Sequence, residues 1–168
     1  FLIGGDVLSS TVVSEIYKKF KQSRFDIINL YGPTECTIDV AYFRVPKKVP
    51  KMPIPIGYPI QNACLYVFDR YGTYCPPFVV GEIGISGVCL GRGYADSSPF
   101  PGYLAHHRKW YPSGDLGFFD HLGRCYVTGR KDGQIKIRGY RIECNEIENH
   151  LNAIPGISMS HVKKILGK

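Results

Sequence analysis

The chain has 168 residues, of which 44% are hydrophobic and 21% charged, values typical of a globular domain with a real core. Its 21 Lys and Arg outnumber its 14 Asp and Glu, and the net charge of +7 would suit a polyanionic or phosphorylated partner. The basic residues stand in small groups without a nucleic-acid motif, so we expect neither nucleic acid nor a membrane as partner. No apolar run approaches membrane-spanning length and nothing marks the chain for export, so we expect a cytoplasmic protein.

The six cysteines occur without a Cys-x-x-Cys pair and without a histidine pair at metal-ligand spacing. This pattern argues against a zinc site. We expect reduced and mostly buried thiols.

The N-terminal part of the chain predicts strands around one helix. Residues 9–22 carry apolar side chains at helical spacing, and three lysines at the end of this range suit a helix C-terminus. The prolines between 46 and 59 allow only an extended linker or an edge segment. The strands expected in this part span residues 1–5, 25–30 and 37–45.

The rest of the chain predicts several short strands and one more helix. Turn sequences at 69–72 and 120–123 favour a small antiparallel barrel or sheet. Asn145 with Glu148 forms a capping-box pattern, which predicts a helix that buries Ile147, Leu151 and Ile154. A glycine-flanked charged segment at 129–133 indicates a domain boundary near Asp132. The strands expected here span residues 64–68, 81–86, 118–119, 124–128 and 134–138.

The heptapeptide Asn-Leu-Tyr-Gly-Pro-Thr-Glu at 29–35 has the chemistry of a nucleotide site. Tyr31 offers a flat face for a base. Thr34 supplies a hydroxyl and Glu35 a carboxylate, the hard oxygen ligands that Mg²⁺ prefers when it carries phosphates. An ordinary turn with a helix-capping Thr explains the same residues equally well, so the heptapeptide alone leaves both interpretations open.

Further motifs follow in order: Gly81-Glu-Ile-Gly-Ile-Ser-Gly87, Gly91-Arg-Gly-Tyr94, Tyr111-Pro-Ser-Gly-Asp-Leu116, and a long motif at 129–143 that runs into Glu146-Ile-Glu148. With the heptapeptide, these motifs resemble the adenylate-forming (AMP-binding) enzymes. The resemblance is strongest to the amino-acid adenylation domains of nonribosomal peptide synthetases, and it covers nearly the whole chain. In that family, ATP and an amino acid give an aminoacyl-adenylate and pyrophosphate. The acyl group then passes to a phosphopantetheine thiol on a peptidyl carrier protein.

The resemblance implies a role for each matching residue. Tyr31 would stack on adenine, Glu35 would hold Mg²⁺, and Asp115 would accept hydrogen bonds from two ribose hydroxyls. Arg130 would donate to the ribose or the α-phosphate. The other residues implied in ATP or adenylate binding are Asn29 and Leu30 at the adenine edge, Gly32 in the turn, and Thr34 at the phosphate.

The resemblance also implies a pocket for the substrate side chain. A small pocket with apolar walls and one carboxylate fits a short side chain that carries a hydroxyl group. Asp39, as an acceptor, favours serine, while Gly4 stands where serine-activating domains usually carry Ser, and glycine or cysteine remain possible. The residues implied at this pocket are Leu2, Gly4, Leu30, Ile38 and Asp39.

The implied fold is a mixed α/β fragment of the adenylation domain. Residues 1–131 would form the C-terminal part of the large subdomain, a sheet edge plus a small β-barrel. Asp132 would be the hinge to residues 132–168, the start of the small α+β subdomain. Gly139 would face the phosphopantetheine tunnel in the thioester-forming arrangement. The family's phosphate loop and catalytic lysine are missing, so we expect the isolated chain to need the rest of the synthetase for activity.

Three alternatives stay open at this point. An acyl- or aryl-CoA ligase would share the adenylate residues but activate an acid without an amino group. A non-catalytic remnant is the second alternative. A basic nucleic-acid module is a distant third, which salt-sensitive retention on DNA would support.

Overall fold

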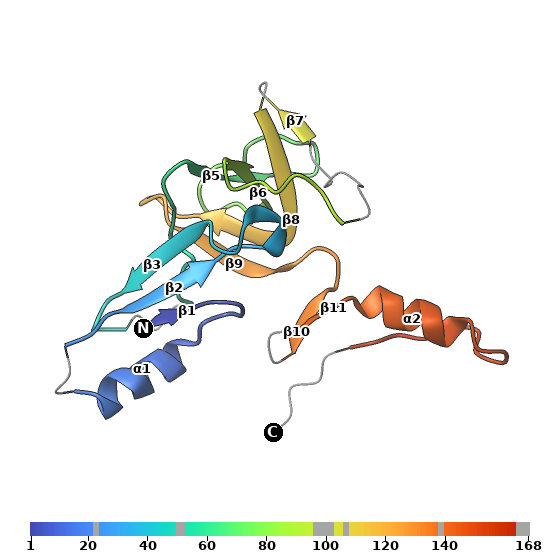
Figure 1. Cartoon of the computed structure of the whole chain (residues 1–168), viewed down its shortest axis with the longest axis horizontal. Helices are drawn as coiled ribbons and strands as arrows, with labels where there is room; N and C mark the ends of the chain where they lie inside the picture. Colours follow the sequence, from blue (N-terminus) through green and yellow to red (C-terminus); the bar gives the residue numbers. More distant parts are fainter. Residues whose placement is uncertain (22–23, 50–52, 96–102, 106–107, 138–139, 164–168) are drawn as a thin grey trace. The chain divides into compact units, whose positions relative to one another are not determined.

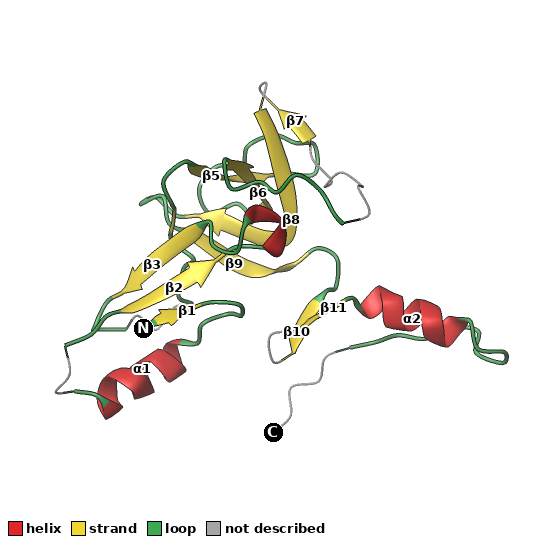
Figure 2. Cartoon of the chain, viewed as in Figure 1, coloured by secondary structure: helices red, strands yellow, loops and turns green. Residues whose placement is uncertain are grey.

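The computed structural model describes residues 1–21, 24–49, 53–95, 103–105, 108–137 and 140–163. The chain contains both helices and strands (Figures 1 and 2), which confirms the expected mixed α/β class. No helix in these ranges is long and apolar enough to cross a membrane. The elements are β1 (Leu2–Ile3), α1 (Ser10–Lys19), β2 (Ile27–Tyr31), the 3-10 helix η1 (Thr34–Cys36), β3 (Ala41–Val45), β4 (Tyr58–Pro59), β5 (Ala63–Phe68), β6 (Gly81–Gly87), β7 (Tyr103–Ala105), β8 (Arg108–Phe119), β9 (Cys125–Arg130), β10 (Ile135–Ile137), β11 (Tyr140–Ile142) and α2 (Cys144–Asn152).

The chain divides into two compact units, Phe1–Gly129 and Arg130–Lys168. The first unit holds both larger sheets, and the second holds β10, β11 and α2. The expected domain limit at 131/132, with its hinge at Asp132, stays a prediction.

The first sheet has the order β1-β2-β3-β4, with β1 parallel to β2 and the other pairs antiparallel. Helix α1 packs on this sheet through Val13, which is fully buried against Ile27 and Val45. Ser9 caps the helix, because its side chain accepts a hydrogen bond from the Thr11 amide at 3.2 Å. The helix ends at Lys19, three residues earlier than predicted, because the backbone leaves the helical region at Phe20.

The second sheet has the order β5-β6-β8-β7. Strand β9 also pairs with β8 but stands outside this order. The pairs β5–β6, β6–β8 and β7–β8 are antiparallel, as the sequence predicts. Strand β8 runs for 12 residues, where the pattern predicts a strand only at 118–119. The pattern misses most of β8 because Pro112 and Gly114 have the character of loop residues.

The two sheets share one hydrophobic core. The segment before β4 joins β9, since the Ile56 amide donates to the Cys125 carbonyl at 2.9 Å and the Cys125 amide to Gly57 at 2.9 Å. Ile56, Cys125 and Ile83 are buried together in this core. Burial raises the pKa of the Cys125 thiol to about 12, so this cysteine is a protonated packing group at neutral pH. All six cysteines are free; three of them are buried and the other three are half-buried.

The predicted strand at 37–45 is wrong in its first part. The chain forms η1 and then passes through two left-handed residues, Thr37 at φ 59° and Ile38 at φ 74°. Only Ala41–Val45 continues as β3. Left-handed conformations in a Thr and an Ile are uncommon, and β-branched composition by itself favours a strand, so this turn has no signal in the local pattern.

In the second unit, β10 and β11 form an antiparallel hairpin, followed by α2. The predicted cap at Asn145 is wrong: Glu143 is the cap residue, it makes no side-chain capping bond, and Asn145 lies inside the helix. The predicted buried face is also wrong in part. Ile147 and Ile154 are exposed, and Leu151 is half-buried.

Candidate functional site

The heptapeptide at 29–35 spans the end of β2 and a tight reversal of the chain. The Val40 amide donates to the Tyr31 carbonyl at 2.7 Å and closes the loop. A Cβ atom at Gly32 would lie 2.1 Å from the Ile38 carbonyl oxygen, a distance that only glycine avoids. The turn therefore depends on glycine at position 32 and presents η1 directly after Tyr31.

Tyr31 and Asp115 meet in the structure, although 84 positions separate them in the chain. The Tyr31 hydroxyl donates a hydrogen bond of 2.6 Å to Asp115 Oδ2. Tyr31 ends β2 in the first sheet, and Asp115 stands on β8 in the second. The two motifs that carry these residues therefore form one site between the sheets.

A bulge in β8 places Asp115. Glu82 pairs with Leu116 and Gly84 with Pro112, so β8 carries two more residues than β6 between these pairs. Gly114 has a φ of 74° at this point, a conformation that suits glycine. A bulge of this kind redirects side chains, which explains how a residue in mid-strand reaches Tyr31.

Ser113 holds the bulge from inside. Its hydroxyl donates to the Ile83 carbonyl at 2.8 Å and accepts from the Asp115 amide at 3.1 Å. Ser113 is buried, so both bonds are shielded from water. The backbone of Asp115 is thus fixed by Ser113, while its carboxylate is bonded to Tyr31.

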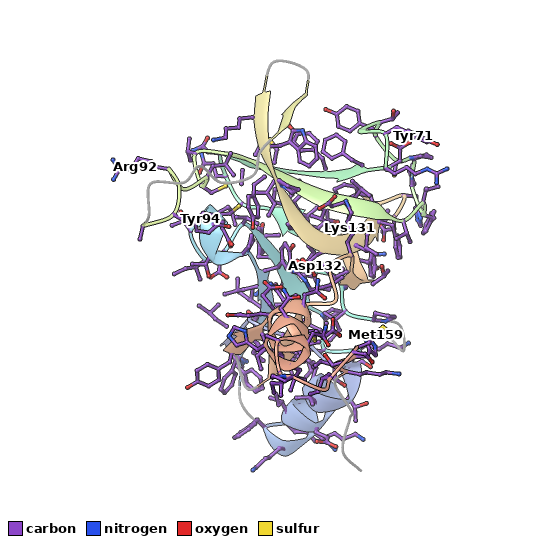
Figure 3. All side chains as sticks on the ribbon, turned by 90° about the vertical axis from the view of Figure 1, so that its right-hand side faces the viewer. Tyr71, Arg92, Tyr94, Lys131, Asp132 and Met159 are labelled. Carbon is purple, nitrogen blue, oxygen red and sulfur yellow. The ribbon has the colours of Figure 1, made fainter. Side chains whose placement is uncertain are left out.

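Glu35 is almost fully buried at 5% exposure, and residues 89–94 pack against it. The Tyr94 hydroxyl donates to Glu35 Oε1 at 3.4 Å, and the Gly91 amide donates to the Glu35 carbonyl at 2.8 Å. A third bond of 2.8 Å joins the Thr37 hydroxyl to the Cys89 carbonyl. Figure 3 shows Tyr94 beside the η1 turn, with Arg92 further out on the same segment.

Tyr94 is the residue of this site that the sequence did not assign. The motif Gly91-Arg-Gly-Tyr94 contributes to the resemblance to the family, but nothing in the local pattern links it to Glu35. The signal is tertiary, because 59 positions separate Tyr94 from Glu35.

Mg²⁺ fits the donor set at Glu35. Within the described ranges, no group of three or more His, Cys, Asp or Glu residues gathers to hold a metal ion. A single protein carboxylate is the arrangement in which Mg²⁺ keeps waters and takes its other oxygens from substrate phosphates. Thr34 is exposed next to Glu35 and can offer its hydroxyl to the same phosphates.

The five residues implied at the substrate pocket differ in their surroundings. A Cβ atom at Gly4 would lie 3.2 Å from Leu30 Cβ, so these two positions touch across β1 and β2. Leu2 and Ile38 are exposed at 72% and 71%, and Asp39 is half-buried. Gly4 and Leu30 are therefore neighbours in the structure, and the roles of all five residues stay predictions.

The remaining implied residues have other partners in this structure. The buried Asn29 amide donates to the Pro55 carbonyl at 2.8 Å, which ties β2 to the proline-rich segment. Arg130 donates to both carboxylate oxygens of Asp132, at 2.8 Å and 2.5 Å. Gly139 lies outside the described residues. The binding roles of Asn29 and Arg130 and the hinge at Asp132 stay predictions.

The model of the AMP-binding enzyme family matches residues 1–95, more than half of the chain, and the chain belongs to this family. It is 38% identical over 158 residues to bacitracin synthase 1 of Bacillus licheniformis. That match covers 89% of this chain but only 3% of the synthase. The resemblance to the adenylation domains of peptide synthetases is thereby confirmed.

Two solved structures have the same fold. One is PA1221, an NRPS protein containing adenylation and PCP domains, with a TM-score of 0.82 and 31% identity over 94% of this chain and 33% of that one. The other is the Vibrio cholerae adenylation domain AlmE in complex with glycyl-adenosine-5′-phosphate, with a TM-score of 0.76 and 31% identity over 90% of this chain and 30% of that one. The chain therefore spans about a third of these structures.

Proposed function

We propose that this chain supplies part of the adenylate site of an amino-acid-activating domain, which forms aminoacyl-AMP and pyrophosphate from ATP and an amino acid. The observation that carries the proposal is the bonded pair Tyr31 and Asp115, with the buried Glu35 in the same heptapeptide as Tyr31, all within a member of the AMP-binding family. These residues offer a ring for the base, a carboxylate for the ribose diol and a metal ligand.

In the proposed reaction, the substrate carboxylate attacks the α-phosphorus of ATP and pyrophosphate leaves. Glu35, with its carboxylate oriented by Tyr94, would hold Mg²⁺, which would offset the negative charge of the phosphates. Asp115 fixes the ribose and Arg130 the ribose or the α-phosphate. Transfer to the phosphopantetheine thiol of a carrier protein would follow, as would be expected of a relative of PA1221, whose chain contains both adenylation and PCP domains. We place this reaction in the cytoplasm.

For the substrate we propose serine. Gly4 and Leu30 touch at one wall, which suits a small side chain, and Asp39 supplies an acceptor for a hydroxyl group. Glycine is the second candidate, because AlmE is 31% identical and was solved with glycyl-adenosine-5′-phosphate. Cysteine is the third.

Pyrophosphate exchange by the intact enzyme that contains these residues tests the proposal. We expect the fastest exchange with L-serine, and Asp39→Ala should lower the preference for serine over glycine by roughly tenfold, because one hydrogen bond to the substrate is lost. Faster exchange with glycine or cysteine would overturn the serine assignment. Exchange driven only by an acid without an amino group would instead favour an acyl- or aryl-CoA ligase.

The isolated 168-residue chain serves as the negative control for that assay. We expect it to catalyse no exchange, since the phosphate loop and the catalytic lysine of the family are not among its residues. Serine-dependent exchange by this chain alone would show that its own residues suffice.

A further inference from the structure

The hydrogen bond between Tyr31 and Asp115 is the contact by which the two sheets meet at the site. At 2.6 Å it is as short as bonds from a hydroxyl group to a charged carboxylate usually are. The Tyr31 ring packs against the core that both sheets share, so the hydroxyl group is held by a side chain with little freedom. A face for adenine explains why an aromatic ring stands at position 31, but it does not explain the hydroxyl group.

We propose that Tyr31 is a positioning residue whose hydroxyl group sets the orientation of the Asp115 carboxylate for the ribose 2′ and 3′ hydroxyl groups. This inference rests on the proposed function and deepens it, since it assigns the hydroxyl group a task separate from that of the ring. The ring contributes to the affinity for the base. The hydroxyl group contributes to the selection of a ribonucleotide.

The geometry of Asp115 explains why its carboxylate needs a hydrogen bond from Tyr31. A vicinal diol is bound well only when the plane of the carboxylate faces both hydroxyl groups. The bulge at Gly114 anchors the backbone of Asp115 through Ser113, whereas the bond from Tyr31 acts on the carboxylate itself. A bond to one carboxylate oxygen removes rotational freedom of the side chain before the ligand arrives, which lowers the entropic cost of binding.

The donor keeps its proton under all ordinary conditions. Burial, together with the neighbouring Asp115 carboxylate, raises the pKa of Tyr31 well above its usual value. The orientation of Asp115 therefore persists from neutral to alkaline pH.

The test uses the intact enzyme that contains these 168 residues, the same protein as in the exchange assay, and measures the affinity of its unaltered chain for two probes, adenosine monophosphate and 2′,3′-dideoxyadenosine monophosphate, by calorimetric titration. The unaltered chain should prefer the ribonucleotide by roughly tenfold or more, because the carboxylate bonds to the diol are charge-assisted. Tyr31→Phe keeps the ring, and it should lower this preference by about three- to tenfold. Its affinity for the dideoxy probe should stay unchanged.

Tyr17→Phe is the matched control. Tyr17 is also half-buried and its hydroxyl group donates to the Val45 carbonyl at 2.8 Å, but it packs in the separate core beside α1. Removing this hydroxyl group should leave the affinities for both probes unchanged. Asp115→Asn should reduce the preference for the ribonucleotide, and adding Tyr31→Phe to it should cause little further loss, because both changes act on the same contact.

The outcomes separate the two claims. If the unaltered chain prefers the ribonucleotide and Tyr31→Phe retains the full preference, the positioning role is wrong and the adenylate site stands. If Tyr31→Phe weakens both probes equally, or abolishes the folded circular dichroism spectrum, the hydroxyl group has only a structural role. If the unaltered chain binds neither probe, the proposed adenylate site is wrong and the positioning role fails with it.

Discussion

At the scale of single residues, the buried carboxylate of Asp120 is a clear case of a charged group that the fold holds in place. Asp120 is buried at the turn between β8 and β9 and is surrounded by donors. Its Oδ1 accepts from the amides of Leu122 and Arg124 at 2.9 and 3.0 Å, and its Oδ2 accepts from the Arg124 guanidinium at 2.7 Å. The turn thus combines a backbone cap with an ion pair.

These contacts predict a pH-dependent contribution of Asp120 to stability. Burial alone would raise the pKa of Asp120, but the bonds from Arg124 and Leu122 outweigh it and hold the pKa below 3.8. A carboxyl group whose pKa is lower in the folded state stabilises the fold above its unfolded pKa, and this contribution is lost as the pH falls through the folded pKa. Asp120→Asn should lower the free energy of unfolding by about 2 kcal/mol at pH 7. The difference in free energy of unfolding between this variant and the unaltered chain should narrow below pH 3.8.

Urea titrations at several pH values measure both effects, and Asp69→Asn is the matched control. Asp69 accepts from the amides of Tyr71 and Thr73 in a turn of the same form, but it is exposed. We expect a smaller loss of stability for this control. Equal losses at Asp69 and Asp120 would show that the ion pair with Arg124 contributes nothing.

At the scale of elements, the turn at 31–40 is the most constrained part of the site. A Cβ atom at Gly32 would also lie 2.8 Å from the Ile38 carbonyl carbon and 2.9 Å from Asp39 Cα. All of these are backbone atoms, so the loop itself must move to admit a side chain. Gly32→Ala should therefore destabilise the chain by about 2–4 kcal/mol, measured by urea unfolding.

Gly129→Ala provides the comparison for Gly32→Ala. No atom lies within 4 Å of the position that its Cβ would take. Its effect on the free energy of unfolding should be close to zero. A similar effect for both variants would mean that the close approach at Gly32 has no energetic consequence.

The same turn shows where prediction from sequence succeeds and where it ends. The strand predicted at 25–30 and the helix predicted at 9–22 follow from local patterns, and both are found with shifted ends, as Ile27–Tyr31 and Ser10–Lys19. The left-handed Thr37 and the bulge at Gly114 do not follow, because both are fixed by contacts with strands that lie far away in the chain. The resemblance to the family selected Tyr31 and Asp115 as site residues. Only the structure shows that they are bonded to each other.

At the scale of the whole chain, strand β1 lies at the edge of its sheet in the described residues. Phe1, Leu2 and Val7 are exposed there, at 62%, 72% and 72%. An edge strand with exposed apolar side chains is a surface that pairs readily with another strand. The chain spans about a third of the related structures, and this edge offers a surface on which a further strand can pair.

The junction between the two units carries the last prediction. Arg130 holds both oxygens of Asp132, and Asp132 Oδ1 also accepts from the Gln134 amide at 3.1 Å. Burial alone would raise the pKa of Asp132, but these bonds hold it below 3.8, so the pair is fully charged at neutral pH. The segment around Asp132, the proposed hinge, is therefore held by these hydrogen bonds, which must break locally before a protease can cut the segment.

Arg130→Gln, which keeps the bond between Lys131 and Asp132 unchanged, should speed tryptic cleavage after Lys131 by about tenfold, since the loss of roughly 1.4 kcal/mol from the Arg130–Asp132 pair raises the open population by that factor. Mass spectrometry of short digests at pH 7.5 would follow the fragments 1–131 and 132–168. Asp69→Asn, in the first unit, should leave the rate of this cut unchanged. Equal rates in the unaltered and Arg130→Gln chains would show that the pair of Arg130 and Asp132 does not stabilise the junction, and would remove the physical basis for a hinge that Asp132 controls.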